Sequence, residues 1–290
     1  MGTRLYAKGI APGACLEELN LSRPELVREV HAEYRAAGAE ILKSNTFGAN
    51  PVRLARHQRE SQCRELNIAG VRLARAEAGS DGVVAGSVGP LGGTFPEGSA
   101  KAFALQISAL AEGGADCILL ETFRDLYELS EAVHAAHEVA ALPVIAQVSP
   151  DKHGELNGGL RPEEYVAGLS LWGVDAIGCN CGAGLEGVLE TIRRMSALTD
   201  KPLAAQPSAG LPFSRRGVWI YPDPPEELAR AATRFLRLGA RLIGGCCGTT
   251  PAHILAMRQA LEESRTRPLP PATEQSISAR RRWTPRRLDG

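Results

Sequence analysis

Apolar residues along this chain follow two patterns that alternate. In the first, they recur at a spacing close to 3.6 residues, as Leu26, Val27, Val30 and Tyr34 do, which is typical of a helix with one buried face. In the second, a short unbroken apolar run such as Cys117–Leu120 is typical of a buried strand. A repeated succession of helix and buried strand favours parallel β-α-β units over an antiparallel sheet.

A short sequence motif recurs where a predicted helix is followed by a predicted strand. Each copy has a glycine, a small or apolar residue, a polar residue and then an apolar run. A glycine directly after a helix adopts the left-handed conformation that ends it, and the residues that follow enter the sheet. The copies are Gly38–Leu42, Gly114–Ile118, Gly173–Ile177 and Gly239–Ile243.

Together these patterns predict seven strands, each followed by a helix, with one more helix before the first strand. Seven strands and eight helices indicate an α/β fold, a (β/α)8 TIM barrel whose first strand is missing or truncated at the N-terminus. An open doubly wound sheet fits less well, because its glycine-rich nucleotide fingerprint is absent. Strands are expected near residues 40–47, 83–86, 117–120, 143–148, 176–179, 203–206 and 242–245, helices near 22–38, 51–79, 100–113, 125–140, 161–172, 184–198, 225–238 and 251–263, and broad loops at 86–98 and 207–225.

The character of the sequence changes near its end. Residues 1–263 carry the alternating pattern and are expected to form the barrel. From residue 264 the chain is rich in arginine and proline and has no periodic apolar pattern. We therefore expect residues 264–290 to be a disordered basic tail.

Composition narrows the class of protein. The 33 Lys and Arg residues balance the 33 Asp and Glu residues, so no net charge attracts nucleic acid or an anionic membrane. No apolar run reaches the roughly 18–20 residues that a membrane span needs, and no signal peptide is visible. Seven cysteines, an odd number in a chain of this size, favour a reducing compartment over a disulfide scaffold. We expect a cytoplasmic protein that binds neither nucleic acid nor membrane.

Three cysteines stand where two predicted strands end. Cys181 follows the strand near residues 176–179, and the adjacent Cys246 and Cys247 follow the last strand. In a β/α barrel the chemistry lies at the carboxyl ends of the strands. Three thiolates with one open position are what a reactive zinc site needs.

Other interpretations of the cysteines remain open from spacing alone. Buried cysteines also pack as small apolar groups, which is what we expect of Cys63 and Cys117. A closed four-cysteine zinc site would need Cys179 or Cys15 as well.

Five segments of the chain resemble the homocysteine S-methyltransferase family, which includes the homocysteine module of cobalamin-dependent methionine synthase and betaine–homocysteine methyltransferase. The resemblance runs from Met1 to about Met257 and is strongest to the methyltransferase half of bacterial enzymes that also carry a methylenetetrahydrofolate reductase. No reductase activity is expected, because the chain ends where that second half would begin. The segments are Ser44–Asn50, Gly86–Pro90, Leu120–Phe123, Gly178–Gly182 and Gly244–Pro251.

The resemblance implies a reaction and assigns residues to it. Cys181, Cys246 and Cys247 would bind Zn²⁺, and the thiol of homocysteine would take the fourth position. Bound there, the thiol has a lowered pKa and stays a thiolate, which attacks a methyl group and leaves as methionine. Glu121 would pair with the α-ammonium group of the amino acid.

Two further residues are candidates for the site, and the chain departs from the family pattern at three places. Asn45 and Thr46 are candidates to bind the substrate carboxylate, with a turn or capping role as the alternative. Thr122 and Ser208 stand where some relatives carry a tyrosine or asparagine that fills the open zinc position. The chain also begins at Met1–Thr3, inside the family motif Asp-Gly-Ala-Met-Gly-Thr, so we expect the natural start to lie upstream.

The sequence thus predicts a cytoplasmic zinc-dependent methyltransferase that converts homocysteine to methionine. Candidate donors are S-methylmethionine, S-adenosylmethionine, betaine and methyltetrahydrofolate, the last with a separate reductase or cobalamin-binding partner. Aromatic residues of the 207–225 loop are candidates to hold a cationic donor. Two alternatives stay open: a zinc-stabilised barrel without catalysis, and a metal-free thiol protein in which Cys246 and Cys247 act in redox chemistry.

Overall fold

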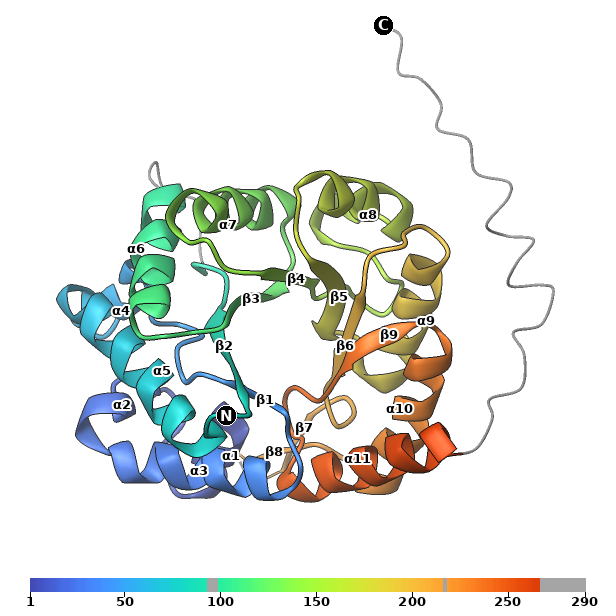
Figure 1. The fold of residues 1–290 in the computed structure, drawn as a ribbon, viewed down its shortest axis with the longest axis horizontal. Coiled ribbons are helices and arrows are strands. Elements are labelled where there is room, and N and C mark those ends of the chain that lie inside the picture. The colour runs from blue at the N-terminus through green and yellow to red at the C-terminus, as the bar shows by residue number, and fades with distance from the viewer. Residues whose placement is uncertain (93–98, 216–217, 267–290) are drawn as a thin grey trace, which may run out of the picture.

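Seven parallel strands form one curved sheet with helices along its outer side (Figure 1). The computed structural model describes residues 1–92, 99–215 and 218–266. The strand order is β1-β2-β3-β4-β5-β6-β9, so consecutive strands of the barrel pattern are neighbours, as expected of β-α-β units. The barrel-type α/β fold with seven strands is therefore confirmed. The strands are β1 (Ile41–Lys43), β2 (Val83–Val88), β3 (Cys117–Phe123), β4 (Val144–Val148), β5 (Ala176–Cys181), β6 (Leu203–Pro207) and β9 (Ala240–Ile243).

The eight predicted helices are present except over residues 51–79, and the short helices at Gly2–Ala7, Leu19–Ser22 and Asn157–Gly159 were not predicted. Over residues 51–79 the prediction of one helix is wrong: the segment divides into α4, a 3-10 turn and α5, because Gln58 has a left-handed φ of 56° that a helix cannot continue through. No helix within the described residues is long and apolar enough to cross a membrane. The helices are α1 (Gly2–Ala7), α2 (Leu19–Ser22), α3 (Pro24–Ala36), α4 (Pro51–Ala55), η1 (Glu60–Gln62), α5 (Cys63–Ala78), α6 (Ser99–Glu112), α7 (Leu126–Val139), η2 (Asn157–Gly159), α8 (Pro162–Leu171), α9 (Gly184–Ser196), α10 (Pro225–Arg237) and α11 (Pro251–Thr266).

Two loops and the start of the tail also differ from expectation. The segment 207–225 is not wholly a loop, since β7 (Phe213–Arg215) and β8 (Val218–Ile220) pair in it as an antiparallel hairpin. Of the loop expected at 86–98, residues 86–88 belong to β2, and residues 93–98 lie outside the described residues. Helix α11 passes the boundary expected at residue 263 and ends at Thr266. The rest of the predicted tail, from residue 267, lies outside the described residues.

The motif repeated at the start of four strands bonds neighbouring strands to each other in two of its copies. Its glycines all have left-handed φ values, from 75° to 92°. In two copies the polar residue is an aspartate that bonds the neighbouring strand twice. Asp116 accepts from the Val84 amide at 2.7 Å and donates its own amide to the Val84 carbonyl at 2.9 Å. Asp175 makes the same pair of bonds to Val144, at 2.8 Å and 2.9 Å.

The inner face of the sheet carries two layers of side chains. The lower layer is apolar and consists of Ala85, Cys117, Leu119, Ile145, Ala176 and Ala204. Because strand residues alternate between faces, residues two or four positions further along face inwards again. These residues form a second layer at the carboxyl ends of the strands, which we call the polar layer: Lys43, Ser87, Glu121, Gln147, Asn180 and Gln206. The larger apolar core lies between the sheet and the helices.

The sheet is open between its terminal strands, β1 and β9. Within the described residues neither strand pairs on its outer edge. The chain begins beside this opening with α1, a helix and not the strand that would complete a barrel (Figure 1). The Thr3 hydroxyl accepts from the Gly248 amide at 3.2 Å, so the first residues contact the loop that follows β9. The expectation that the first barrel strand is missing is confirmed for the chain as given.

Candidate active site

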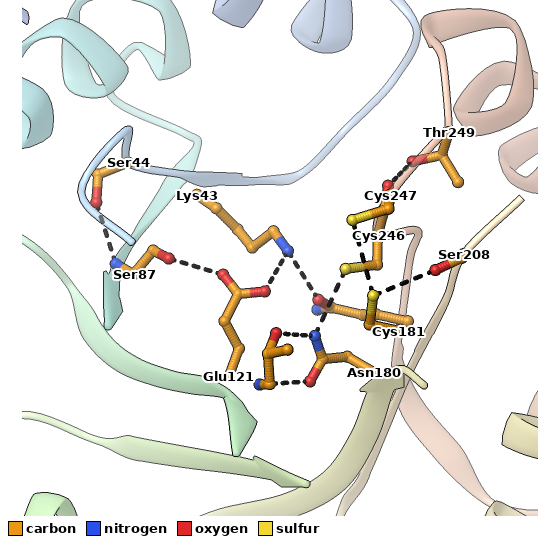
Figure 2. A network of polar contacts seen from close by, with 12 residues as sticks. Lys43, Ser44, Ser87, Glu121, Asn180, Cys181, Ser208, Cys246, Cys247 and Thr249 are labelled. Carbon is orange, nitrogen blue, oxygen red and sulfur yellow. Dashed lines mark hydrogen bonds and ion pairs between the residues drawn. The ribbon is translucent and has the colours of Figure 1, made fainter. Parts of the chain in front are cut away.

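Three cysteine side chains meet at the carboxyl ends of β5 and β9. The Cys181 and Cys247 sulfur atoms lie 3.7 Å apart, and those of Cys181, Cys246 and Cys247 all lie within 4.8 Å of one another (Figure 2). Backbone hydrogen bonds hold the loop after β9 against the end of β6. The Cys246 amide donates to the Pro207 carbonyl at 2.8 Å, and the Cys247 carbonyl accepts from the Ala209 amide at 2.9 Å.

Polar groups around the cluster donate to its sulfur atoms. The Ser208 hydroxyl lies 3.3 Å from the Cys181 sulfur, and the Asn180 amide lies 3.5 Å from the Cys246 sulfur. Hydrogen bonds from the Cys246 and Cys247 thiols hold the pKa of Cys181 far below its usual value. The same contact with Cys181 raises the pKa of Cys247. The cluster therefore loses its first proton easily, and a bound cation would favour loss of the others.

The remaining cysteines lie outside this cluster. Cys179 is fully buried and faces the helices, where burial raises its pKa, and Cys15 contacts Glu17. Neither joins the three sulfur atoms, so the four-cysteine alternative has no support among the described residues. Cys63 and Cys117 are buried in apolar surroundings as expected, and burial raises the pKa of each to about 11.

Glu121 projects from β3 into the polar layer, where protein groups hold both of its oxygen atoms. The Ser87 hydroxyl donates to Oε1 at 2.7 Å, and the Lys43 ammonium donates to Oε2 at 2.8 Å (Figure 2). Lys43 also donates to Gln206 Oε1 at 3.1 Å. Burial lowers the pKa of Lys43, but the Glu121 carboxylate and the nearby thiols outweigh burial and raise it, so Lys43 is protonated.

Asn180 connects this ion pair to the cysteines. Its side-chain oxygen accepts from the Thr122 amide at 2.8 Å, and its nitrogen donates to the Thr122 hydroxyl at 2.8 Å as well as to Cys246. Thr122 follows Glu121 directly and has a left-handed φ of 70°, while Cys181 follows Asn180 and has a φ of 57°. Sequence reasoning missed Lys43, Gln206 and Asn180 as members of the site. The only signal was a polar residue at the last inward position of six of the seven strands, β1 to β6.

Asn45 and Thr46 lie in the loop after β1 with their side chains buried. Asn45 donates to the Leu16 carbonyl at 2.7 Å and to the Asn20 side chain at 2.9 Å. The Thr46 hydroxyl donates to the Ser87 carbonyl at 2.8 Å. These bonds are to protein groups and fix the loop. The carboxylate-binding role assigned to both residues stays a prediction.

One cavity of about 1090 Å³ extends from the ion pair of Lys43 and Glu121 to the cysteine cluster. Its wall includes Lys43 and Glu121 on one side and the three cysteines on the other. It also reaches the opening between β1 and β9. A small molecule in this cavity can touch the ion pair and the sulfur atoms at once.

Comparison with known proteins gives consistent matches over nearly the whole chain. The family model described as homocysteine S-methyltransferase matches residues 1–261. Methionine synthase of Mycobacterium tuberculosis is 34% identical over 285 residues, which cover 90% of this chain and 24% of that protein. Methionine synthase of Mycobacterium leprae is 33% identical over 265 residues, covering 85% of this chain and 22% of that protein. The chain thus spans about a quarter of the length of these relatives.

Solved structures agree with these matches. The metallated form of the homocysteine methyltransferase MmuM from Escherichia coli is 30% identical with a TM-score of 0.75, over 89% of this chain and 93% of that one. A methyltransferase from Methanosarcina mazei, at 13% identity and a TM-score of 0.58, shares the fold alone.

Proposed function

Because this chain belongs to the homocysteine S-methyltransferase family, we propose that it transfers a methyl group to the thiol of homocysteine with a zinc ion held by Cys181, Cys246 and Cys247. Family membership supports methyl transfer as the activity. The zinc ion, the roles of individual residues and the donor are the parts that we propose. The observation that carries the proposal is the group of three sulfur atoms within 4.8 Å at the ends of barrel strands.

The cysteine cluster fits a zinc ion. Sulfur atoms bound to one tetrahedral zinc ion lie about 3.8 Å apart, given Zn–S bonds of about 2.3 Å. The 3.7 Å between Cys181 and Cys247 matches this spacing. When bound, zinc would supply a fourth coordination position and a Lewis acid that keeps a substrate thiol deprotonated at neutral pH. Ser208 and Asn180 donate to the cysteine sulfurs and so disperse their negative charge.

Glu121 is the residue that we propose for the substrate's α-ammonium group. Its side chain is only 6% exposed, and Ser87 and Lys43 fix the direction of its carboxylate. A buried, oriented carboxylate binds an ammonium group more strongly than an exposed one, because less water competes for it. Glu121 and the cysteines line the same cavity, so one homocysteine molecule can contact both.

The methyl donor has less support from the structure. Of the aromatic residues in the 207–225 segment, Tyr221 lines the cavity, whereas Trp219 is 64% exposed and Phe213 is 48% exposed. Tyr6, Tyr34 and Phe47 from other segments also line the cavity, so aromatic rings are present there but do not select one donor. S-methylmethionine, S-adenosylmethionine, betaine, and methyltetrahydrofolate with a reductase or cobalamin-binding partner are therefore compared directly in the assay below.

The proposal predicts one zinc ion per chain and methionine formation with at least one of these donors. Cys247→Ala removes one of the three sulfur ligands. Its zinc affinity should fall by more than roughly 100-fold, because losing only a hydrogen bond to a metal ligand already costs 10- to 100-fold. Methionine formation should be lost with the metal. Zinc is measured by elemental analysis after dialysis against a chelator, and methionine by chromatography.

Cys63→Ala serves as the matched control, since Cys63 is a free thiol outside both the cluster and the cavity lining. It should keep both zinc and activity. A metal-free but active enzyme would overturn the zinc mechanism. Zinc binding without methionine from any donor would instead favour a non-catalytic zinc barrel, and thiol redox activity without zinc would favour the metal-free alternative.

A further inference from the structure

Lys43 places a partly buried positive charge where the proposed function needs only a carboxylate. It stands at the carboxyl end of β1 and is the only cation among the six side chains of the polar layer. Its side chain is 25% exposed, so the cavity reaches it, while that of Glu121 is 6% exposed. The ammonium points across the sheet to Glu121, beside the cysteine cluster (Figure 2).

Both members of this ion pair keep bonding capacity. An ammonium group has three N–H donors, and among the described residues two go to Glu121 and Gln206. A carboxylate has about four lone-pair sites, of which Ser87 and Lys43 use one each. The pair can therefore accept a ligand without first coming apart.

An amino acid matches this pair in charge and in spacing. Homocysteine carries an ammonium and a carboxylate on one carbon atom, about as far apart as two hydrogen-bonded atoms. The 2.8 Å between Lys43 Nζ and Glu121 Oε2 is of the same size. A zwitterion laid against the pair closes a ring of four charges that alternate in sign.

We propose that Lys43 binds the α-carboxylate of the amino-acid substrate while Glu121 binds its α-ammonium group. This assignment rests on the proposed function and names a residue that recognises the substrate. It makes the site selective for α-amino acids over other thiols. The side chain of homocysteine would then extend from the pair along Asn180, which contacts both Thr122 beside Glu121 and Cys246 in the cluster.

The test compares two ligands that differ only in the carboxylate. Homocysteine and 3-aminopropane-1-thiol are each titrated into zinc-loaded protein by calorimetry. The wild-type protein should bind homocysteine roughly 10- to 100-fold more tightly, the usual effect of one hydrogen bond to a charged group. In Lys43→Met this preference should fall at least about tenfold, with little change for the amine thiol.

Further variants keep the test decisive if Lys43→Met is unstable. Lys43→Gln removes the charge but keeps a donor, and should also lose the preference. Lys43→Arg keeps the charge and should restore part of it. Lys101→Met is the matched control, because Lys101 is exposed on α6. Zinc content measured in every variant shows whether the cluster is intact.

The other outcomes overturn the assignment. Equal weakening of both ligands in Lys43→Met would mean that Lys43 only supports Glu121. Tighter binding of both ligands would mean that Lys43 occupies Glu121 in competition with the substrate. If wild-type protein binds neither ligand, the proposed function falls together with this assignment, whereas the first two results leave the proposed function standing.

Discussion

Asn180 links the residue beside Glu121 to the cysteine cluster through one buried side chain. It is fully buried, and both ends of its amide are used: the oxygen by the Thr122 amide, the nitrogen by the Thr122 hydroxyl and the Cys246 sulfur. A buried polar group that loses its partner costs more than the bond contributes, because no water replaces it. The Thr122 amide therefore depends on Asn180 for a partner.

Asn180→Ala should lower the free energy of unfolding by about 1–3 kcal/mol, because it leaves the Thr122 amide unpaired in the interior. Zinc affinity should also fall, since Cys246 loses a hydrogen-bond donor. Urea denaturation followed by circular dichroism measures the first effect, and competition with a chelator measures the second. Asn157→Ala, at an exposed position, should change neither. Equal urea midpoints for the two variants would contradict the role given to Asn180.

The sequence predicts some residues of the site and not others for a physical reason. Cys246 and Cys247 are adjacent, follow an apolar run and stand between glycines, so their position at a strand end is a local property. Lys43 meets Gln206 across 163 positions of sequence, and their meeting depends on the curvature and register of the whole sheet. Local patterns show which residues face inwards but not which of them touch.

At the scale of elements, two aspartates of the repeated motif, Asp116 and Asp175, bond neighbouring strands together. Asp116 and Asp175 each bond the neighbouring strand through both side chain and backbone. Partial burial raises the pKa of Asp116, but the Val84 amide and the Arg75 guanidinium outweigh it and hold that pKa below its usual value. Asp116 therefore contributes stability while it is ionised.

Asp116→Asn should lower the free energy of unfolding at pH 7 by about 0.5–1 kcal/mol, since a neutral amide accepts the Val84 and Arg75 bonds more weakly. A group with a depressed folded pKa stabilises the fold above its unfolded pKa and loses that effect as pH falls through the folded value. The difference between wild type and variant should therefore shrink below about pH 4. Denaturant titrations at pH 7 and pH 3 measure it, with the exposed Asp81→Asn as control. A difference that grows in acid would contradict this account.

Element boundaries show where local sequence signals lose their value. Four of the seven strands, β1, β3, β5 and β9, were predictable because each is an apolar run directly behind a helix-ending glycine. The break at Gln58 was not, since glutamine carries no signal for a left-handed conformation. The hairpin of β7 and β8 was missed because each strand has only three residues, too few to show alternation.

The whole molecule is a curved sheet with an opening, and its strands differ in how well they are supported. β3, β4 and β5 pair on both sides, whereas within the described residues β1 and β9 pair on one. An unpaired strand edge exposes backbone groups to water and opens more readily than the middle of a sheet. The cavity reaches this opening, so the least supported strands border the candidate site.

Hydrogen exchange should show this difference in stability between the central strands and the terminal strands. Amides of β4 are expected to exchange near the rate of global unfolding, and those of β1 and β9 much faster, through local opening. Mass spectrometry of peptides covering 41–43, 144–148 and 240–243 measures the rates. β6 pairs with both β5 and β9 and provides the internal reference. Uniform protection across all strands would show that the opening carries no weakness.

Thr122 and Cys181 bear on how the protein can be engineered. Both hold a left-handed backbone conformation that costs residues other than glycine about 1–2 kcal/mol. Glycine at position 122 would remove that cost but also the hydroxyl that Asn180 bonds. A glycine at this position would therefore favour thermal stability and at the same time remove a hydrogen bond that orders the site. A thermostability screen that does not also assay the proposed methyl transfer would therefore select a substitution that removes a hydrogen bond from the candidate site.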